Sequence, residues 1–299
     1  MADADVVAIV NPLSGVGALP DVARRRTALL ERRFAAAGVT GRVHFTDRSG
    51  HARELARAAL DAGAALVIAW GGDGTINEVA STLARSKTPL GIVPAGSGNG
   101  FANELGLDTD PERAIDTALT GGDRAIDAGE LDGRLFFNIA GIGFDAVVAE
   151  QFNRRSLGRR GMWPYVRIGF RELVCYRGLR YRLVLGQDDE IATNALVIAF
   201  ANGREYGNRI RLAPNAKVDD GLLEAIVVED RPPLARLWGC RHLALGHIER
   251  TPGVRVRSVE TALIETDGDI VYHVDGEIGR ARGRATVRVV PAALRVRVK

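Results

Sequence analysis

The residues of this 299-residue chain that could do chemistry gather in short glycine-rich segments. The most informative is Gly71-Gly-Asp-Gly-Thr75, which lies between an apolar run and a helical pattern. Three glycines let backbone N–H groups approach an anion closely, and the start of the following helix adds unpaired donors and a positive dipole end. The segment therefore favours phosphate binding, with a plain tight turn as the alternative.

Asp73 is electrostatically out of place inside an anion-binding loop. A Mg²⁺ ion between this carboxylate and a phosphate, bound directly or through water, would resolve the conflict. The spacing Thr75-x-x-Glu78 also predicts a capping box that would fix the start of the following helix.

Two further loops combine glycine with small hydroxyl or amide groups, Asn11-Pro-Leu-Ser-Gly15 and Pro94-Ala-Gly-Ser-Gly-Asn99. Each loop taken singly is explained by turn chemistry. Three such loops at equivalent positions indicate a nucleotide or polyphosphate ligand.

The first 120 residues repeat one pattern, a short apolar run, a glycine-rich or polar break and a helical stretch. The predicted strands are 6–10, 42–45, 65–70 and 90–93. Two helices are predicted near 20–37 and 51–62, a third from the GGDGT segment through residue 84, and a fourth from the PAGSGNG segment to about residue 105. This alternation predicts a doubly wound α/β domain with a mostly parallel sheet. Its loops at the carboxyl ends of the strands would gather in one crevice.

After about residue 127 the pattern changes to alternating strands separated by Asp-Gly pairs at 132–133, 220–221, 267–268 and 275–276. Asp-Gly between alternating segments is a hairpin signal, so a second, antiparallel β domain is expected over 128–290, after an α/β domain over 1–127. One helical interruption is expected over about 145–176.

Composition excludes several classes of protein. Forty basic against 37 acidic residues give a net charge of +3, too little to indicate nucleic-acid binding. Two cysteines favour a reducing compartment, and the start of the chain has no signal-peptide pattern. The longest apolar runs have seven residues, whereas a spanning helix needs roughly 20, so membrane contact would be peripheral.

Several common motifs are missing. The sequence has no Gly-Lys-Ser/Thr, no G-x-S-x-G and no H-E-x-x-H. The segment Gly141–Ala146 matches G-x-G-x-x-A, but it lies outside the βα-repeating half and lacks the acidic residue expected about 20 positions later. A nicotinamide site there is disfavoured.

The ordered set NPLSG, GGDGT, PAGSGN, GIGFDA, DDGL at 219–222, DGE at 275–277 and PAALR at 291–295 resembles the diacylglycerol kinase, sphingosine kinase and ceramide kinase superfamily. It is most similar to bacterial YegS-type lipid kinases, from about residue 6 to residue 296. The resemblance implies a nucleotide-binding α/β domain and a C-terminal antiparallel β-sandwich, with the active site between them and residues 291–299 rejoining the first domain.

The resemblance also implies a set of nucleotide-binding residues, with Thr46 as the contact after the second strand. The set is Asn11, Ser14, Gly15, Thr46, Gly71, Gly72, Asp73, Gly74, Thr75, Asn77, Glu78, Gly96, Ser97, Gly98 and Asn99. Gly100 stands where the family usually has an aspartate. The water-linked carboxylate network that the family builds would here join Asp73 and Asp127 only.

The segment from Lys217 to Leu222 resembles a structural Mg²⁺ site of bacterial members. Asp220 would supply a carboxylate and Lys217 and Leu222 backbone carbonyls, a donor set that suits Mg²⁺. Asp127 is added to the predicted metal-binding residues because it belongs to the carboxylate network that the resemblance implies. The residues alone favour a plain Asp-Gly turn, and only the resemblance favours the metal.

The Asp275-Gly-Glu277 segment carries the expected general base. A lipid hydroxyl is a weak nucleophile at neutral pH, so a carboxylate should accept its proton as it attacks the γ-phosphate. The resemblance places the acceptor here, with Glu277 preferred and Asp275 as the rival. Asp73 completes the catalytic set, and a simple hairpin turn is the alternative.

The segment 152–182 contains nine arginines and one acid, interleaved with Trp163, Tyr165, Phe170, Tyr176 and Tyr181. Arginine with interfacial aromatics suits an anionic bilayer surface, and a solvated helix face is the alternative. The sequence thus predicts a cytoplasmic kinase, dependent on ATP and Mg²⁺, that acts at the inner membrane face on diacylglycerol, a long-chain base or phosphatidylglycerol. An NAD-kinase-like enzyme of soluble metabolites, a silent nucleotide- or lipid-binding protein and a homodimeric state all stay open.

Overall fold

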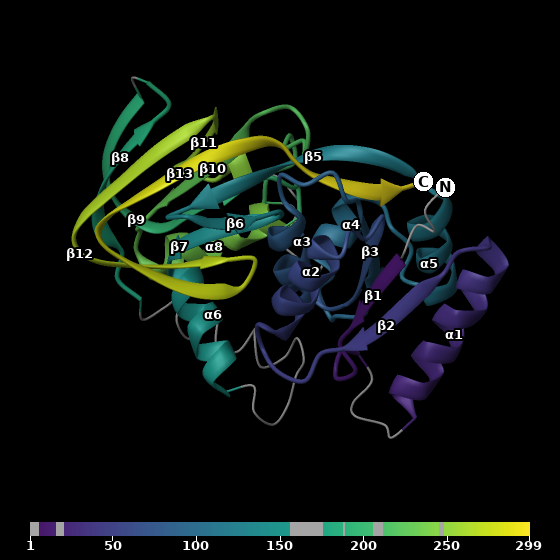
Figure 1. The fold of residues 1–299 in the computed structure, drawn as a ribbon. Helices are drawn as coiled ribbons and strands as arrows, with labels where there is room; N and C mark the ends of the chain where they lie inside the picture. Colours follow the sequence, from purple (N-terminus) through teal and green to yellow (C-terminus); the bar gives the residue numbers. More distant parts are fainter. Residues whose placement is uncertain (1–5, 16–20, 156–175, 188, 206–211, 245–247) are drawn as a thin grey trace. The chain divides into compact units, whose positions relative to one another are not determined.

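The computed structural model describes residues 6–15, 21–155, 176–187, 189–205, 212–244 and 248–299. The chain forms two compact units (Figure 1). Unit 1 contains Met1–Ile126 together with Ala292–Lys299, and unit 2 contains Asp127–Pro291.

Unit 1 is built on a parallel sheet in the order β2-β1-β3-β4. The strands are β1 (Val6–Val10), β2 (Gly41–Phe45), β3 (Leu66–Gly71) and β4 (Leu90–Pro94). β1, β3 and β4 are buried at every position, as expected for parallel strands covered on both faces. The end of β13 (Glu277–Val298) adds a further parallel pairing to β4, at Val296 and Leu90.

In the described part of unit 1, five helices connect or flank these strands. They are α1 (Val22–Ala37), α2 (His51–Asp61), α3 (Asp73–Leu83), α4 (Gly100–Glu104) and α5 (Pro111–Thr120). α1 packs against α5 and α2 against α3, and Figure 1 shows the two pairs on opposite sides of β1 and β3. Leu30 and Phe34 of α1 share one core with Ile115 of α5 and with Ile68 and Trp70 of β3. The predicted α/β architecture is confirmed.

Unit 2 is an antiparallel, strand-rich unit whose strands follow the order β11-β10-β9-β7-β12-β13, with β8 against both β9 and β12. Its strands are β5 (Gly122–Leu131), β6 (Arg134–Phe136), β7 (Ile139–Gly143), β8 (Leu179–Leu185), β9 (Asp189–Ala201), β10 (Leu223–Glu229), β11 (Val254–Val259), β12 (Thr261–Val274) and β13. The inward residues of these strands form one apolar core that includes Phe136, Tyr181, Phe200 and Ile264. The predicted antiparallel second domain is confirmed.

Two of the four Asp-Gly pairs form two-residue hairpin turns. Asp132-Gly133 joins β5 to β6 and Asp275-Gly276 joins β12 to β13, and all four residues have positive φ. The expectation of a break at 267–268 is wrong, because these residues lie inside β12. There the register against β13 shifts between Glu265 and Asp269, so the extra residues are absorbed as a bulge.

Among its described residues, unit 2 has the helices α6 (Phe144–Arg155) and α8 (Pro233–Ala244) and a short 3-10 turn, η1 (Ile248–Arg250). α6 corresponds to the start of the helix expected over 145–176, and residues 156–175 lie outside the described part of the chain. Within the described residues, every helix is too short or too polar to cross a bilayer.

Candidate active site

The three glycine-rich loops of unit 1 meet at the carboxyl ends of β1, β3 and β4. The Asn11 side chain donates to the Thr75 hydroxyl over 3.0 Å and joins the first loop to the second. The backbone N–H of Asn99 donates to Asp73 Oδ2 over 3.0 Å and joins the third loop to the second. The structure therefore brings most of the predicted nucleotide-binding residues together.

Glycines allow the second and third loops to approach each other. A Cβ at Gly96 would lie 2.9 Å from Gly72 Cα, and one at Gly98 would lie 3.2 Å from Asp73 Oδ2. The Asn99 side chain also accepts the N–H of Gly96 over 2.7 Å, which closes the third loop on itself. Larger residues at these glycines would push the loops apart.

The predicted capping box is wrong. α3 already begins at Asp73, with Gly72 as its N-cap, so Thr75 lies inside the first turn and not at the cap. The buried Glu78 carboxylate accepts the N–H of Gly50 over 2.8 Å and that of Arg53 over 3.3 Å. These donors belong to the first turn of α2, so Glu78 caps the neighbouring helix instead of its own.

The remaining predicted nucleotide-binding residues differ in their surroundings. Thr46 follows β2, is buried, and donates its N–H to the Val10 carbonyl at the end of β1. Ser97 is exposed on the third loop. Asn77 is buried within α3, where its side-chain oxygen accepts the Ser81 hydroxyl.

Arg26 of α1 supports the first loop. One of its guanidinium nitrogens donates to the Asn11 carbonyl over 2.6 Å and the other to the Ser14 carbonyl over 2.7 Å. The guanidinium carbon also lies 5.0 Å from the centre of the Trp70 ring, within range of a cation–π interaction. Burial lowers the pKa of Arg26 from its ordinary value.

In unit 2, the Asp275 carboxylate anchors the turn of the D-G-E segment. It accepts the N–H groups of Phe137, Asn138 and Ile139 over 2.9, 3.1 and 2.9 Å. A carboxylate that accepts three consecutive backbone N–H groups is fixed in place and stabilised in its ionised form. Asp275 thus fastens the β12–β13 turn to the start of β7.

Glu277, two residues further on, has different contacts. Its carboxylate forms an ion pair with Arg134 over 2.9 Å, and its side chain remains 32% exposed. Arg134 also donates to the carbonyl of Ile278 over 2.8 Å, which ties the arginine to the same strand. Both acids of the D-G-E segment are partly exposed, but both oxygens of Asp275 accept backbone N–H groups, whereas Glu277 pairs with Arg134 alone among the described residues. Glu277 is therefore the acid that a substrate hydroxyl could approach more easily.

Three of the predicted metal-binding residues, Lys217, Asp220 and Leu222, lie in the segment before β10, and the fourth, Asp127 of β5, is hydrogen-bonded to it. Buried Asp127 accepts the N–H of Gly221 over 2.7 Å, and exposed Asp220 accepts the N–H of Leu222 over 3.1 Å. The N–H groups of the consecutive residues Gly221 and Leu222 therefore hold the two carboxylates at the same turn. Lys217, whose backbone carbonyl is the further predicted donor, lies in the same segment of the chain. Oxygen donors of this kind fit Mg²⁺.

In the described residues, no group of three or more His, Cys, Asp or Glu side chains could hold a metal ion. A magnesium ion at this turn would therefore depend on backbone carbonyls and water in addition to Asp127 and Asp220.

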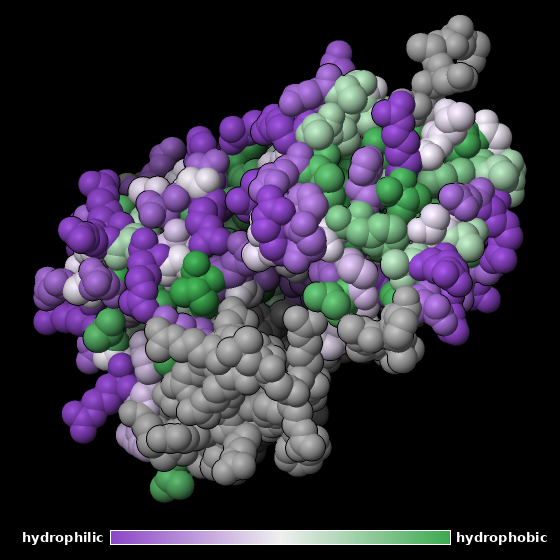
Figure 2. Space-filling model, turned by 60° about the horizontal axis from the view of Figure 1, so that its bottom comes forward, coloured by the Kyte–Doolittle hydropathy of each residue, from purple (hydrophilic) through white to green (hydrophobic). Residues whose placement is uncertain are grey.

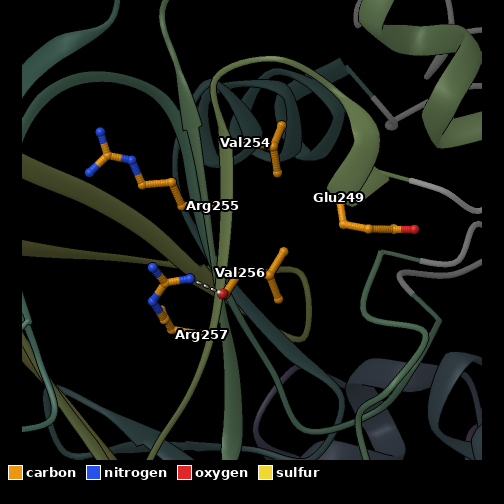
Figure 3. A pocket seen from close by; sticks show the side chains of 5 residues that line it. All are labelled: Glu249, Val254, Arg255, Val256 and Arg257. Carbon is orange, nitrogen blue, oxygen red and sulfur yellow. Dashed lines mark hydrogen bonds between the residues drawn. The ribbon is translucent and has the colours of Figure 1, made fainter.

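A cavity of about 500 Å³ lies elsewhere in unit 2, along the edge strand β11 (Figure 3). Arg255 and Arg257 point to one side of the strand, and Val254 and Val256 point toward the side of Glu249. A second cavity lies against β8, β12 and β13. Neither includes a predicted site residue among the described residues that line it.

Comparison with known proteins identifies the family. Residues 5–131 match the diacylglycerol kinase catalytic domain, and residues 138–298 match the YegS C-terminal NAD kinase beta sandwich-like domain. A diacylglycerol kinase of Mycobacterium tuberculosis is 34% identical over 97% of this chain and 94% of its own length. The chain belongs to the family of diacylglycerol kinases and YegS lipid kinases. The lipid kinase YegS of Escherichia coli is 30% identical over 87% of both chains.

Solved structures agree with the fold of this lipid kinase. A crystal structure from Bacillus anthracis str. Sterne superposes with a TM-score of 0.80 at 21% identity, covering 100% of this chain and 98% of its own. A diacylglycerol kinase structure from the same strain gives a TM-score of 0.74 at 18% identity over the same shares of the two chains. The fold of the lipid kinase family is thus reproduced over the whole chain.

Sequence reasoning missed two arginines of this lipid kinase. Arg26 supports the first loop, and Arg134 pairs with Glu277. All but three of its 40 basic residues are arginines, so no local pattern separates these two from the rest. Only their partners in the folded units reveal them.

Proposed function

We propose that this lipid kinase transfers the γ-phosphate of ATP to the hydroxyl of a lipid such as diacylglycerol, a long-chain base or phosphatidylglycerol, with Glu277 as the proton acceptor. The contrast within the D-G-E segment carries the assignment of the base. Asp275 is occupied by three backbone N–H groups, whereas Glu277 keeps an accessible carboxylate beside Arg134. A base must reach the proton that it accepts, which favours Glu277.

The joined loops of unit 1 support the nucleotide part of the proposal. The first turn of α3 places backbone N–H groups and the positive end of the helix dipole at the second loop. The Asn11–Thr75 and Asn99–Asp73 hydrogen bonds hold these loops in one arrangement before any ligand binds. Phosphoryl transfer depends mainly on such positioning and on charge neutralisation.

We assign two roles to Mg²⁺. The first ion would lie between Asp73 and the phosphates and neutralise their charge during transfer. The second would be structural, at the turn that carries Asp127 and Asp220, with the carbonyls of Lys217 and Leu222 as further donors. The support for the second site is the placement of both carboxylates by the N–H groups of residues 221 and 222.

We propose peripheral contact with an anionic membrane, on the cytoplasmic side, as the source of the lipid. Support comes from two joined segments of unit 2, 176–180 and 230–236, in which Asp230 accepts the N–H of Gly178 and Arg236 donates to the carbonyl of Tyr176. Leu179 and Leu234 are exposed here, at 44% and 82%.

Three exposed arginines lie in the same two segments, at positions 177, 180 and 231. Exposed leucines beside cations suit a bilayer with anionic headgroups. On the face drawn in Figure 2, hydrophilic residues dominate the described part, and hydrophobic residues are interspersed among them. The predicted basic and aromatic stretch continues into residues 156–175, outside the described part of the chain.

The test is transfer of radiolabelled γ-phosphate in mixed micelles that contain diacylglycerol, sphingosine, ceramide or phosphatidylglycerol. ATP and GTP are compared as donors, with and without Mg²⁺, and NAD and water serve as control acceptors. Label from Mg-ATP on one lipid class supports the proposal and identifies the substrate.

Label on NAD would move the enzyme to the soluble-metabolite kinases. Nucleotide binding without transfer to any lipid would contradict the proposal and indicate a silent binding protein.

A further inference from the structure

A buried histidine and a buried aspartate face each other beside the D-G-E turn. His273, near the end of β12, is 2% exposed, and its Nε2 lies 2.7 Å from Oδ2 of Asp145 in the first turn of α6. His273 is the second residue before Asp275, and Asp145 belongs to the GIGFDA segment, which runs from the end of β7 into α6. The pair thus joins two of the family's sequence motifs inside unit 2.

Gly141 makes room for this pair. It lies opposite His273 in the β7–β12 register. A Cβ at Gly141 would lie 2.0 Å from Asp145 Oδ2 and 2.6 Å from His273 Nε2. Real Cβ atoms do not approach that closely, so any larger residue would separate the two side chains.

The other ring nitrogen of His273 faces the turn. Nδ1 accepts the N–H of Gly276 over 3.3 Å. An imidazole nitrogen accepts only when it carries no proton, so the proton of the neutral ring lies on Nε2 and is donated to Asp145. The ring therefore bridges a fixed carboxylate and the centre of the Asp275-Gly276 turn.

We infer that His273 and Asp145 are positioning residues that hold the D-G-E turn, and with it Glu277, in the geometry that proton transfer requires. This inference rests on the proposed role of Glu277 as the base. Asp275 fixes one side of the turn to β7, and His273 fixes the other side through Gly276. Hydrogen bonds from residues behind a reacting group keep that group in place, although these residues do not touch the substrate themselves.

The surroundings of His273 make the arrangement dependent on pH. The charged groups that face the ring are Asp145 on α6 and Asp275 on the turn, while its cross-strand neighbours, Gly141 and Ile278, are uncharged. Burial lowers the pKa of His273, but the charge and hydrogen bond of Asp145 and the charge of Asp275 raise it above its ordinary value.

Activity and stability should then respond to His273 in opposite directions. As the pH falls through the pKa of the folded protein, Nδ1 gains a proton and can no longer accept the Gly276 N–H, so kcat falls. The raised pKa instead contributes stability that is fully present below the ordinary pKa of histidine and is lost as the pH rises through the folded value.

Three variants test the inference. His273→Gln retains a donor near the Nε2 position but removes the acceptor for Gly276, and His273→Asn does the reverse. For His273→Gln we expect about a tenfold loss of kcat, as for one lost hydrogen bond, with KM for ATP unchanged and the contribution of His273 missing from the acid limb of the pH profile. For His273→Asn we expect a smaller loss of kcat and, again, an acid limb without the contribution of His273.

Asp145→Asn should shift the acid limb to lower pH, because it removes a charge that raises the histidine pKa. The exposed His44 lies in unit 1, so His44→Gln serves as the control and should leave the profile unchanged. An acid limb in His273→Gln identical to that of the wild type would overturn the inference.

Histidine NMR of the wild-type protein keeps the inference separate from the proposed function. We expect the Nε2–H tautomer above the pKa of His273 and a Gly276 amide shift that titrates with the ring. If no lipid is phosphorylated but these signals are present, the proposed function fails and the structural pair stands. If Nδ1 carries the proton instead, the inference fails whatever the activity.

Discussion

The glycine-rich loops of unit 1 and the D-G-E turn of unit 2 are held in different ways. In the loops the hydrogen-bond donors that join one loop to the next are neutral groups, such as the Asn11 amide and the Asn99 N–H. Arg26 of α1 adds a hydrogen bond to the backbone of the first loop. The turn is held by ionised or ionisable groups, with Asp275 on three N–H groups and Glu277 on Arg134. In the proposed function, the loops would position donors for the phosphates of the nucleotide, and the turn would hold the base in place.

Neutralising Asp73 is the most severe test of the loop side of this comparison. Asp73→Asn keeps an oxygen that can accept the Asn99 N–H but removes the charge proposed to bind Mg²⁺. We expect a loss of about 10³-fold in kcat, the upper range for removing one transition-state contact, with an unchanged melting temperature. The measurement is lipid phosphorylation at saturating Mg-ATP. Activity near wild type would remove Asp73 from the mechanism.

Glu277→Gln and Asp275→Asn separate the two acids of the turn. Loss of the base should lower kcat about 10²- to 10³-fold with little change in stability, because the Gln carbonyl still accepts from Arg134. Asp275→Asn should instead cost about 1–3 kcal/mol, since its amide cannot satisfy all three N–H groups. Lipid phosphorylation and thermal unfolding are measured together. The reverse pattern would exchange the roles of the two acids.

Arg26→Lys tests whether the support beneath the first loop matters for nucleotide binding. Lysine cannot reach both carbonyls with a planar fork, so we expect KM for ATP to rise about tenfold with kcat nearly unchanged. Arg25→Lys, at the exposed neighbouring position on α1, is the matched control. Equal KM values in the two variants would show that the Arg26 contacts only stabilise the fold.

Asp220→Ala tests the proposed metal turn. The variant should lose a few degrees of melting temperature relative to wild type in Mg²⁺ and almost nothing in chelator, because binding stabilises only the folded state. Asp267→Ala, at an exposed position of the β12 bulge, controls for loss of one surface charge. The same shift in Mg²⁺ and chelator would exclude a structural ion at Asp220.

Glu78→Gln should have the smallest effect. Because the carboxylate caps α2, we expect a loss of about 1 kcal/mol in stability and no change in KM for ATP. Urea unfolding and nucleotide titration are sufficient to measure both. A raised KM with unchanged stability would instead support the predicted role of Glu78 in nucleotide binding.

The fold could be predicted from the sequence wherever burial gives the apolar residues a regular spacing along the chain. Fully buried runs such as 66–71, each followed by a helical pattern, predict parallel βα units, and alternating segments predict the antiparallel unit. The same reasoning gathered the three loops, because the carboxyl ends of neighbouring parallel strands meet at one edge.

Long-range partners could not be predicted. Thr75 and Glu78 have the spacing of a local cap, yet the Glu78 side chain reaches Gly50, 28 positions away. Arg26 and Arg134 gain their roles only from the groups that surround them in the folded units. The pair of His273 and Asp145 is likewise separated by 128 positions in sequence.

The path of β13 has a consequence for how the protein is made. Residues 292–299 belong to unit 1, where Val296 pairs with Leu90 and the carbonyl of Ala293 accepts the N–H of Arg85. Because the N-terminal part of a chain leaves the ribosome first, the sheet of unit 1 stays incomplete until residues 292–299 have also emerged. Proteins of two units commonly fold one domain at a time during synthesis. Unit 1 of this protein cannot complete its fold in that way, because its sheet includes residues that are synthesised after unit 2. Its first-made unit is finished last.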